Sequence, residues 1–195
     1  MRPSHAGAFR LETVCYNSLV NAATVTIALS AATLIVVGAA SVAAIVQLRH
    51  LRTSNQLNAL LAILNEWNLS AVQEALAELL AIPDKMRDPQ YVASLTGPGA
   101  IDRVTHREFL ALDLWEQIGT YCKHGLVDER ILLDITSTQA GRCWRCAEPA
   151  IALLRQRSGP AAFENFEYLA VRAQLWERRY PDGTYPRRLP RMTEL

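Results

Sequence analysis

Charged side chains are missing from a long stretch near the amino end of this 195-residue chain. Between Thr13 and Leu48 there is no Asp, Glu, Lys or Arg, although the whole chain carries 20 basic and 19 acidic residues. Cysteine is scarce, with four residues, and glycine and proline contribute nine each. These scarcities exclude a collagen, a disulfide scaffold and a disordered acidic chain. The balance of charge also removes any overall bias toward nucleic acid.

The familiar patterns of catalytic and metal-binding residues are also missing. The sequence has no Glu-x-x-His, no His-x-x-x-His, no glycine-rich phosphate loop and no Gly-x-Ser-x-Gly elbow. The histidines, His5, His50, His106 and His124, are scattered, and His106 is expected in solvent in a first helical turn. We therefore predict no catalytic residue, no cofactor-binding residue and no cofactor.

One short motif contains two cysteines, Cys143-Trp144-Arg145-Cys146. A redox motif of this spacing should follow a strand, and no strand is predicted before it. A zinc site needs two more ligands, and the nearest are Cys122 and His124, which point to different faces of a helix. Cys143 and Cys146 share one helical face, as two small core residues would. We predict that these cysteines pack in the core and that the chain has no metal site.

The uncharged stretch predicts a transmembrane helix over residues 22–48. Crossing about 30 Å of hydrocarbon takes roughly 20 helical residues, and inside lipid the backbone must satisfy its own hydrogen bonds. A cleaved signal peptide has a shorter apolar region that begins earlier, and a buried core helix of this length does not suit so small a domain. We therefore expect an uncleaved anchor whose partner is the lipid bilayer.

Basic residues on both sides of the predicted span bear on its orientation. Arg2 and Arg10 precede it, whereas Arg49, His50 and Arg52 follow it directly. Positive residues close to the membrane favour the cytoplasmic side, and free thiols suit a reducing compartment. We predict a cytoplasmic C-terminal domain.

The rest of the chain has helical periodicity throughout, which predicts an all-α fold: one N-terminal transmembrane helix followed by a bundle of about five helices. The predicted parts are an N-terminal segment (1–21), the transmembrane helix (22–48), a helical domain (49–180) and a disordered Pro/Arg-rich tail (181–195). The first part of the domain is predicted as a helix over 57–67, with Leu57, Leu60, Leu61, Leu64 and Trp67 inward, and a helix opened by a Ser70–Gln73 capping box and closed by Pro83. A loop over 84–102, with one helical turn near Tyr91, leads to a helix opened by a Thr105–Glu108 capping box, with Trp115 and Ile118 on its inward face, and ended at Gly125. We then predict a short helix capped by Asp128, a helix over 139–157 that is kinked or broken near Glu148 by Pro149, and a last helix over 160–179.

Charged side chains in the domain are expected to be structural. Glu116 lies beside a predicted apolar face, and we expect it to pair with a buried arginine such as Arg155, while Glu164 and Glu167 form a polar face.

The tail region carries five arginines that either stay in solvent or lie on anionic lipid. Aromatic residues do not alternate with these arginines, so no nucleic-acid partner is predicted. The arginines are Arg178, Arg179, Arg187, Arg188 and Arg191.

Four segments after the apolar stretch, SNQLNALLAILNEW, KHGLVDERILLDI, PAIALLR and FENFEYLA, carry a resemblance. In this order they resemble a family of uncharacterised bacterial membrane proteins with one N-terminal span and a small helical domain. The likeness covers roughly residues 20–178. It implies a bacterial inner-membrane protein whose helical domain has unknown function, and it brings no active residues to transfer.

Two function classes remain. The first is a non-enzymatic, single-span membrane protein whose domain serves as an interaction or scaffold module for a second copy of the chain or an unidentified membrane-associated protein. Small residues four apart, such as Ala28 and Ala32, permit close approach of two spans without requiring it. The alternative is an enzyme or sensor domain whose polar residues converge only in the folded chain. Nothing in the sequence argues for a third class, a defence or stress effector that perturbs the membrane.

Overall fold

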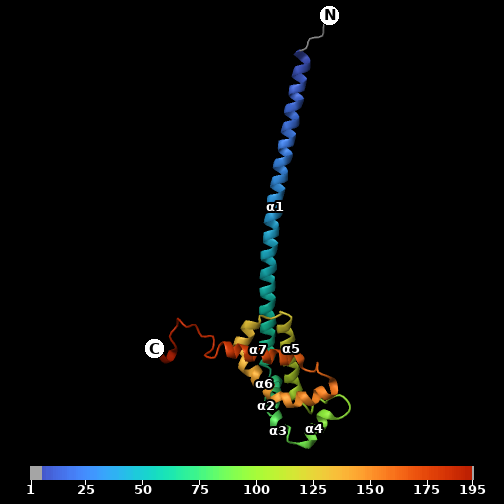
Figure 1. Ribbon diagram of the computed structural model, residues 1–195, viewed down its shortest axis with the longest axis vertical. Helices are drawn as coiled ribbons and strands as arrows, with labels where there is room; N and C mark the ends of the chain where they lie inside the picture. Colours follow the sequence, from blue (N-terminus) through green and yellow to red (C-terminus); the bar gives the residue numbers. More distant parts are fainter. Residues whose placement is uncertain (1–5, 195) are drawn as a thin grey trace. The chain divides into compact units, whose positions relative to one another are not determined.

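The computed structural model describes the backbone of residues 6–194 and the side chains of residues 24–193 (Figure 1). All regular elements in this range are helices, which confirms the all-α prediction. The predicted N-terminal segment, 1–21, and Leu195 lie partly or wholly outside the described residues.

The chain divides into two compact units, residues 1–52 and 53–195. The elements are α1 (Ala6–Trp67), α2 (Ser70–Leu80), α3 (Ile82–Lys85), α4 (Pro89–Thr96), α5 (Glu108–Lys123), α6 (Glu129–Ser158), α7 (Glu164–Arg179) and the 3-10 turn η1 (Met192–Glu194).

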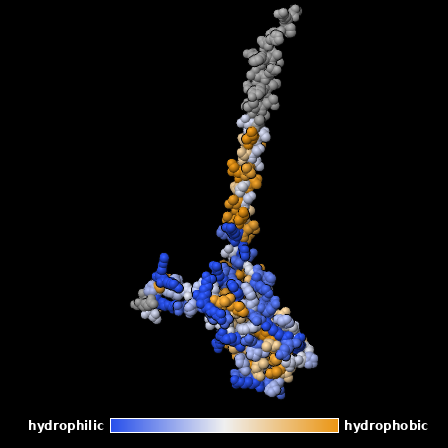
Figure 2. Space-filling model, viewed as in Figure 1, coloured by the Kyte–Doolittle hydropathy of each residue, from blue (hydrophilic) through white to orange (hydrophobic). Residues whose placement is uncertain are grey.

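The apolar stretch lies in α1 and is helical, as predicted. Every described side chain from Thr24 to Leu48 is exposed, and Figure 2 shows this stretch mostly in orange and white. The hydroxyls of Thr33 and Ser41 donate to the carbonyls of Leu29 and Val37, at 2.9 and 2.8 Å. This back-bonding satisfies polar groups inside an apolar helix. Among the described residues, α1 is the one helix long and apolar enough to cross a membrane.

The last part of α1 belongs to the second unit, so the predicted helix over 57–67 is the end of a longer one. Its buried face differs from the predicted one. Leu60 and Ile63 are buried, whereas Leu57 and Leu61 are about half exposed, at 53% and 49%. Leu64 and Trp67 are partly buried against the core, so three of the five predicted residues face it and the predicted face is only slightly rotated, toward Leu57 and Leu61 and away from Ile63.

α2, α3 and α4 follow as short helices. The predicted Ser70–Gln73 capping box is wrong: α2 begins after Leu69, which makes no side-chain cap, and Gln73 donates instead to the Trp67 carbonyl at 2.6 Å. Pro83 does lie beyond the end of α2, in the first turn of α3. The segment predicted as a loop contains the eight-residue α4, whose N-terminus is capped by Asp88.

α5 and α6 are joined by a tight turn that agrees with the predictions. Gly125 has a φ of 66°, a left-handed conformation that glycine adopts without strain. The Asp128 carboxylate then accepts from the Arg130 and Ile131 N–H groups and caps α6. Of the predicted kink or break near Glu148, the break is wrong, because α6 is one 30-residue helix with Pro149 inside it, and the same helix joins the two helices predicted after Asp128 and over 139–157. Packing of its buried face holds the helix together across the missing hydrogen bond.

α7 starts later than predicted, at Glu164 instead of Pro160. Gly159, with φ 88°, ends α6, and Phe163 takes a left-handed φ of 55° immediately before α7. The core forms where α5, α6 and α7 pack around stacked aromatic rings. The Trp115 and Phe166 rings are parallel at 5.6 Å between centroids, and the Trp67 ring meets Trp115 edge-on at 4.9 Å. These contacts join the end of α1 to α5 and α7.

Candidate functional site: a buried network around Glu108

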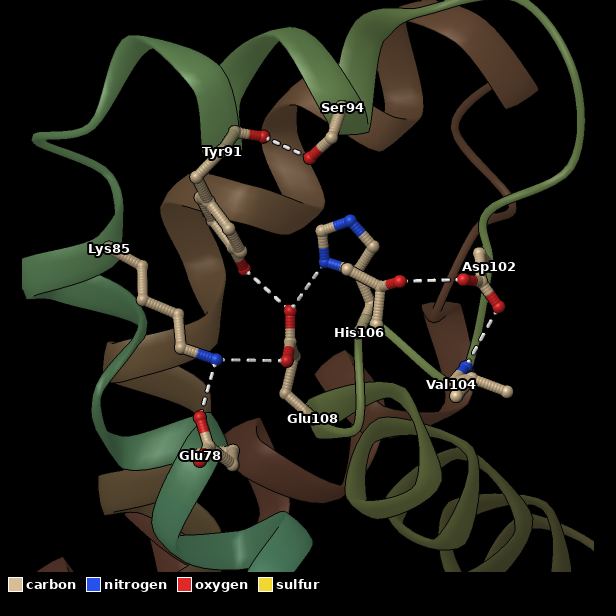
Figure 3. Close-up of polar contacts among 9 residues, drawn as sticks. Glu78, Lys85, Tyr91, Ser94, Asp102, Val104, His106 and Glu108 are labelled. Carbon is tan, nitrogen blue, oxygen red and sulfur yellow. Dashed lines mark hydrogen bonds and ion pairs between the residues drawn. The ribbon is translucent and has the colours of Figure 1, made fainter.

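A carboxylate lies completely buried where four elements meet. Glu108 is the first residue of α5, and its side chain is 1% exposed. Around it lie Glu78 from α2, Lys85 from α3, Tyr91 from α4 and His106 from the turn before α5 (Figure 3). We call these five residues the Glu108 network.

Each oxygen of the Glu108 carboxylate accepts hydrogen bonds from this network. Oε1 accepts from the Tyr91 hydroxyl at 2.9 Å and from His106 Nδ1 at 3.0 Å. Oε2 accepts from Lys85 Nζ at 3.0 Å, and the same ammonium group pairs with Glu78 at 2.7 Å (Figure 3). A buried charge is tolerated when it is paired and hydrogen-bonded in this way.

The network keeps Glu108 ionised. Burial is the largest effect on this carboxyl and would raise its pKa. The hydrogen bonds from His106, the backbone, Lys85 and Tyr91 together outweigh burial, so the pKa of Glu108 lies below its ordinary value. Because the carboxylate is an acceptor only, His106 donates to it through a protonated Nδ1.

The partners of Glu108 respond to its negative charge. Burial raises the pKa of Tyr91, and the charge of Glu108 raises it further. Burial alone would lower the pKa of Lys85, but the hydrogen bonds to Glu78 and Glu108 outweigh it and the pKa is raised. At neutral pH the network therefore holds a lysine cation between two carboxylates.

The network is a structural tie rather than an exposed acid–base site. His106, like Glu108, is buried, with a side chain 7% exposed, so a substrate can touch neither group without separating the helices. A carboxylate that already accepts three hydrogen bonds is a poor general base. What this geometry does is hold α2, α3, α4 and the start of α5 in register.

The structure corrects two predictions here. Glu108 does not form a capping box with Thr105, whose hydroxyl donates instead to Asp102 at 2.6 Å. His106 is buried and not in solvent. Sequence reasoning missed the network because Tyr91 and Lys85 lie 17 and 23 residues from Glu108, and no local spacing links residues so far apart.

A second carboxylate, Glu116 on α5, holds the first turn of α7. Its oxygens accept from the backbone N–H of Asn165 at 3.3 Å and of Phe166 at 2.8 Å, and from the Asn165 side chain at 2.8 Å. A carboxylate at a helix N-terminus satisfies free N–H groups and opposes the helix dipole. The expected Glu116–Arg155 pair is wrong: Arg155 pairs with Glu167 at 2.7 Å.

The candidate metal and redox residues are not gathered into one cluster. Cys122 and Cys143 are buried, Cys146 is half-buried and His124 is exposed at the end of α5. Burial raises the pKa of Cys122 to about 12, with help from Glu129, and that of Cys143 to about 11. Within the side chains that the structure describes, no three His, Cys, Asp or Glu residues lie close enough to share a metal ion. The absence of a metal site stays a prediction.

These features define a class: a small all-helical domain, closed around a buried ionic network, that follows a long apolar helix. The sequence matches the family described as Domain of unknown function (DUF4760) over residues 34–173, and the chain belongs to that family. The match includes the Glu108 network and Cys122, Cys143 and Cys146, and it ends before the arginine-rich tail. Comparisons with curated proteins and with solved structures gave no match.

Proposed function

We propose that this protein is a single-span protein of the bacterial inner membrane whose cytoplasmic helical domain is an interaction or scaffold module. The observation that carries the proposal is the exposure of the apolar side chains of α1. Leu34 and Ile35, near the centre of the stretch, are 74% and 72% exposed. Water penalises such a surface in proportion to its area, and a bilayer removes that penalty. Residues 22–48 are therefore the part that lies in lipid.

The orientation rests on the residues that follow the apolar stretch. Arg49 and Arg52 come directly after Leu48, where basic residues favour the cytoplasmic side. Cys122, Cys143 and Cys146 are free thiols, which suit a reducing compartment. Both observations support a domain that faces the cytoplasm.

The interaction role is supported by apolar side chains that the domain leaves in solvent. Ile131 and Ile135 are one turn apart on α6, and Val171 and Leu175 are one turn apart on α7. All four are about half exposed. Pairs of this spacing form the apolar stripe by which a helix packs on another helix. Glu108 and His106, at the centre of the Glu108 network, are buried and cannot reach a substrate, which supports binding over catalysis.

Substitution inside the apolar stretch tests the anchor. The double substitution Leu34→Lys and Val37→Lys places two charges near the centre of the span. Each charge makes insertion of the helix into the membrane less favourable by about 3 kcal/mol. We expect this variant to leave the membrane fraction on alkaline extraction, while the native chain stays in it. Val104→Lys with Leu126→Lys, at exposed apolar positions of the domain, is the matched control and stays with the membrane. Equal extraction of the two variants contradicts the proposal.

Crosslinking of the full-length chain in its native membrane tests the interaction role. The expected products are a dimer of this chain or a heterologous complex, and both should decrease when Ile131→Glu and Ile135→Glu, or Val171→Glu and Leu175→Glu, are introduced. Recovery of the monomer alone in repeated experiments contradicts an interaction module.

A further inference from the structure

The arginine tail, residues 178–193, is the most basic part of the domain. It contains Arg178, Arg179, Arg187, Arg188 and Arg191, against one acidic residue, Asp182, and Glu194 follows it directly. All side chains from Pro181 to Thr193 are exposed. Arg187 and Arg188 make no ion pair with any side chain that the structure describes. Arg187 and Arg188 thus present positive charge that no ion pair with a described side chain neutralises.

The tail folds back on itself and forms a shallow hollow. The hollow has a volume of about 310 Å³, and Arg179, Arg187 and Arg191 are among its lining residues, with Tyr180 and Tyr185. Side-chain bonds help to hold this fold: the Tyr185 hydroxyl donates to the Pro190 carbonyl at 2.9 Å, and Arg191 donates to the Asp182 carbonyl at 3.1 Å. Three guanidinium groups line the hollow against one carboxylate, that of Asp182, and guanidinium groups suit a phosphate group.

A tyrosine and two aliphatic side chains lie among the arginines of the tail. Tyr185 is 46% exposed, Leu189 57% and Met192 84%. Arginine stems and aromatic rings of this kind lie at the boundary between lipid headgroups and hydrocarbon. A partner that offers both phosphate groups and an apolar layer matches this composition, and a bilayer surface is such a partner.

The tail is attached both to the domain and, through it, to the proposed anchor. The Thr184 hydroxyl donates to the Asp134 carboxylate on α6, so the folded tail lies against the domain. Because the domain is covalently joined to α1, the tail meets the bilayer at a high effective concentration.

We propose that the arginine tail binds the anionic headgroups of the bilayer, with phosphate in the arginine-lined hollow and Tyr185, Leu189 and Met192 toward the hydrocarbon. This proposal rests on the membrane anchor proposed above. The tail would hold the domain against the cytoplasmic surface and restrict which of its faces meets a partner. Each arginine near an anionic surface strengthens such binding about fivefold.

A fluorophore on the tail of the full-length chain tests this proposal. Thr193→Cys carries an environment-sensitive dye in a chain with Cys15→Ser and Cys146→Ser, and the protein is placed in symmetric vesicles, so that both faces present the same lipid. We expect brighter, blue-shifted emission with 30% phosphatidylserine than with phosphatidylcholine alone. Raising NaCl to 0.5 M should reverse the change, because screening then acts over about 4 Å.

Two triple variants that remove the same number of positive charges test whether the tail or another part of the surface binds the lipid. Arg187→Gln, Arg188→Gln and Arg191→Gln should weaken tail binding about a hundredfold, while Arg87→Gln, Arg142→Gln and Arg145→Gln at exposed positions elsewhere leave it unchanged. Equal emission in the two lipids, or equal loss with the two triple variants, overturns the proposal. Inorganic phosphate at constant ionic strength should compete with the headgroups for the hollow and weaken tail binding; tail binding that is insensitive to it overturns the placement of phosphate in the hollow.

The same vesicles keep the two proposals apart. Alkaline extraction of each preparation reports whether the chain is held by its span. A chain that resists extraction while its tail dye ignores phosphatidylserine removes the tail proposal and leaves the anchor standing. A chain that is extracted from both lipids removes the anchor itself.

Discussion

Gly119 on α5 lies directly against the backbone of Asn165 on α7. A Cβ atom built on Gly119 would be 2.0 Å from the Asn165 carbonyl oxygen and 2.5 Å from the carbonyl carbon. The two helices approach this closely because position 119 has no side chain. The approach brings Glu116, one turn earlier, within reach of the N–H groups of Asn165 and Phe166.

Gly119→Ala should destabilise the domain by about 3 kcal/mol, because the added methyl group meets backbone that cannot move aside locally. Gly141→Ala on α6 is the matched control: its Cβ would be 3.5 Å from the flexible end of Arg145, so the alanine should stabilise the helix by about 0.5–1 kcal/mol. Thermal unfolding followed by circular dichroism compares the two. A melting temperature that rises in both variants would contradict the close approach.

Glu116→Ala should destabilise the domain by about 2 kcal/mol, because it leaves the N–H groups at the start of α7 without their acceptor. Glu116→Gln should retain part of this stability through its amide oxygen. Glu66→Ala, at an exposed position near the end of α1, is the control and should change stability by less than about 0.5 kcal/mol. Denaturant unfolding measures all three, and equal midpoints for Glu116→Ala and Glu66→Ala would contradict the capping role.

The Glu108 network predicts a stability optimum bounded by two titrations. The pKa of Glu108 is lowered on folding, so its contribution is complete above its unfolded value of 4.5 and is lost as pH falls toward the folded value. The pKa of Tyr91 is raised on folding, so its contribution is complete below 10.0 and is lost as pH rises further. The free energy of unfolding should therefore be highest between these two pKa values and fall at lower and at higher pH.

Two substitutions test which residue causes the loss of stability at low pH (the acid limb) and which contributes to the loss at high pH (the alkaline limb). Glu108→Gln should flatten the acid limb and destabilise the domain by about 3 kcal/mol at pH 7, since it leaves the Lys85 cation without its buried partner. Tyr91→Phe should make the alkaline limb shallower without abolishing it, because the buried thiols of Cys122 and Cys143 also have raised pKa values and lose stability in the same direction. Unfolding midpoints across pH 3–11 check both, and an acid limb of unchanged slope in Glu108→Gln would contradict the assignment to Glu108.

Thiol labelling should distinguish the three cysteines of the domain. Cys122 and Cys143 are buried, with pKa values raised to about 12 and 11, so at pH 8 few of these groups are thiolates. Cys146 is half-buried and should react with a maleimide at least tenfold faster. Peptide mapping by mass spectrometry follows each site, and all three should react rapidly in denaturant. Equal rates for Cys143 and Cys146 in the folded chain would contradict the predicted burial.

Some local patterns were predicted correctly and others were not. The apolar helix, the Asp128 cap and the Gly125 turn are present in the structure, whereas the two predicted capping boxes, Ser70–Gln73 and Thr105–Glu108, do not form. The face of α5 that carries Trp115 and Ile118 is buried as predicted, because helical periodicity alone identifies it.

Features that depend on distant contacts were missed. Glu108 matched a local capping pattern, yet Lys85 and Tyr91 determine where its side chain goes. Pro149 suggested a break, but packing along the buried face of α6 keeps the helix continuous. Nothing around Gly119 in the sequence indicates that the backbone of Asn165 lies against it.

The most direct test of the membrane anchor combines fractionation with the mass of the intact chain. Membranes from cells that express the full-length protein are washed with alkaline carbonate, and the retained protein is weighed by mass spectrometry. The account predicts a chain of 21.7 kDa, with residues 22–48 still present, in the washed membranes. A chain found in the soluble fraction, or one shortened by cleavage within the Ala-rich GAASVAA segment, would contradict it.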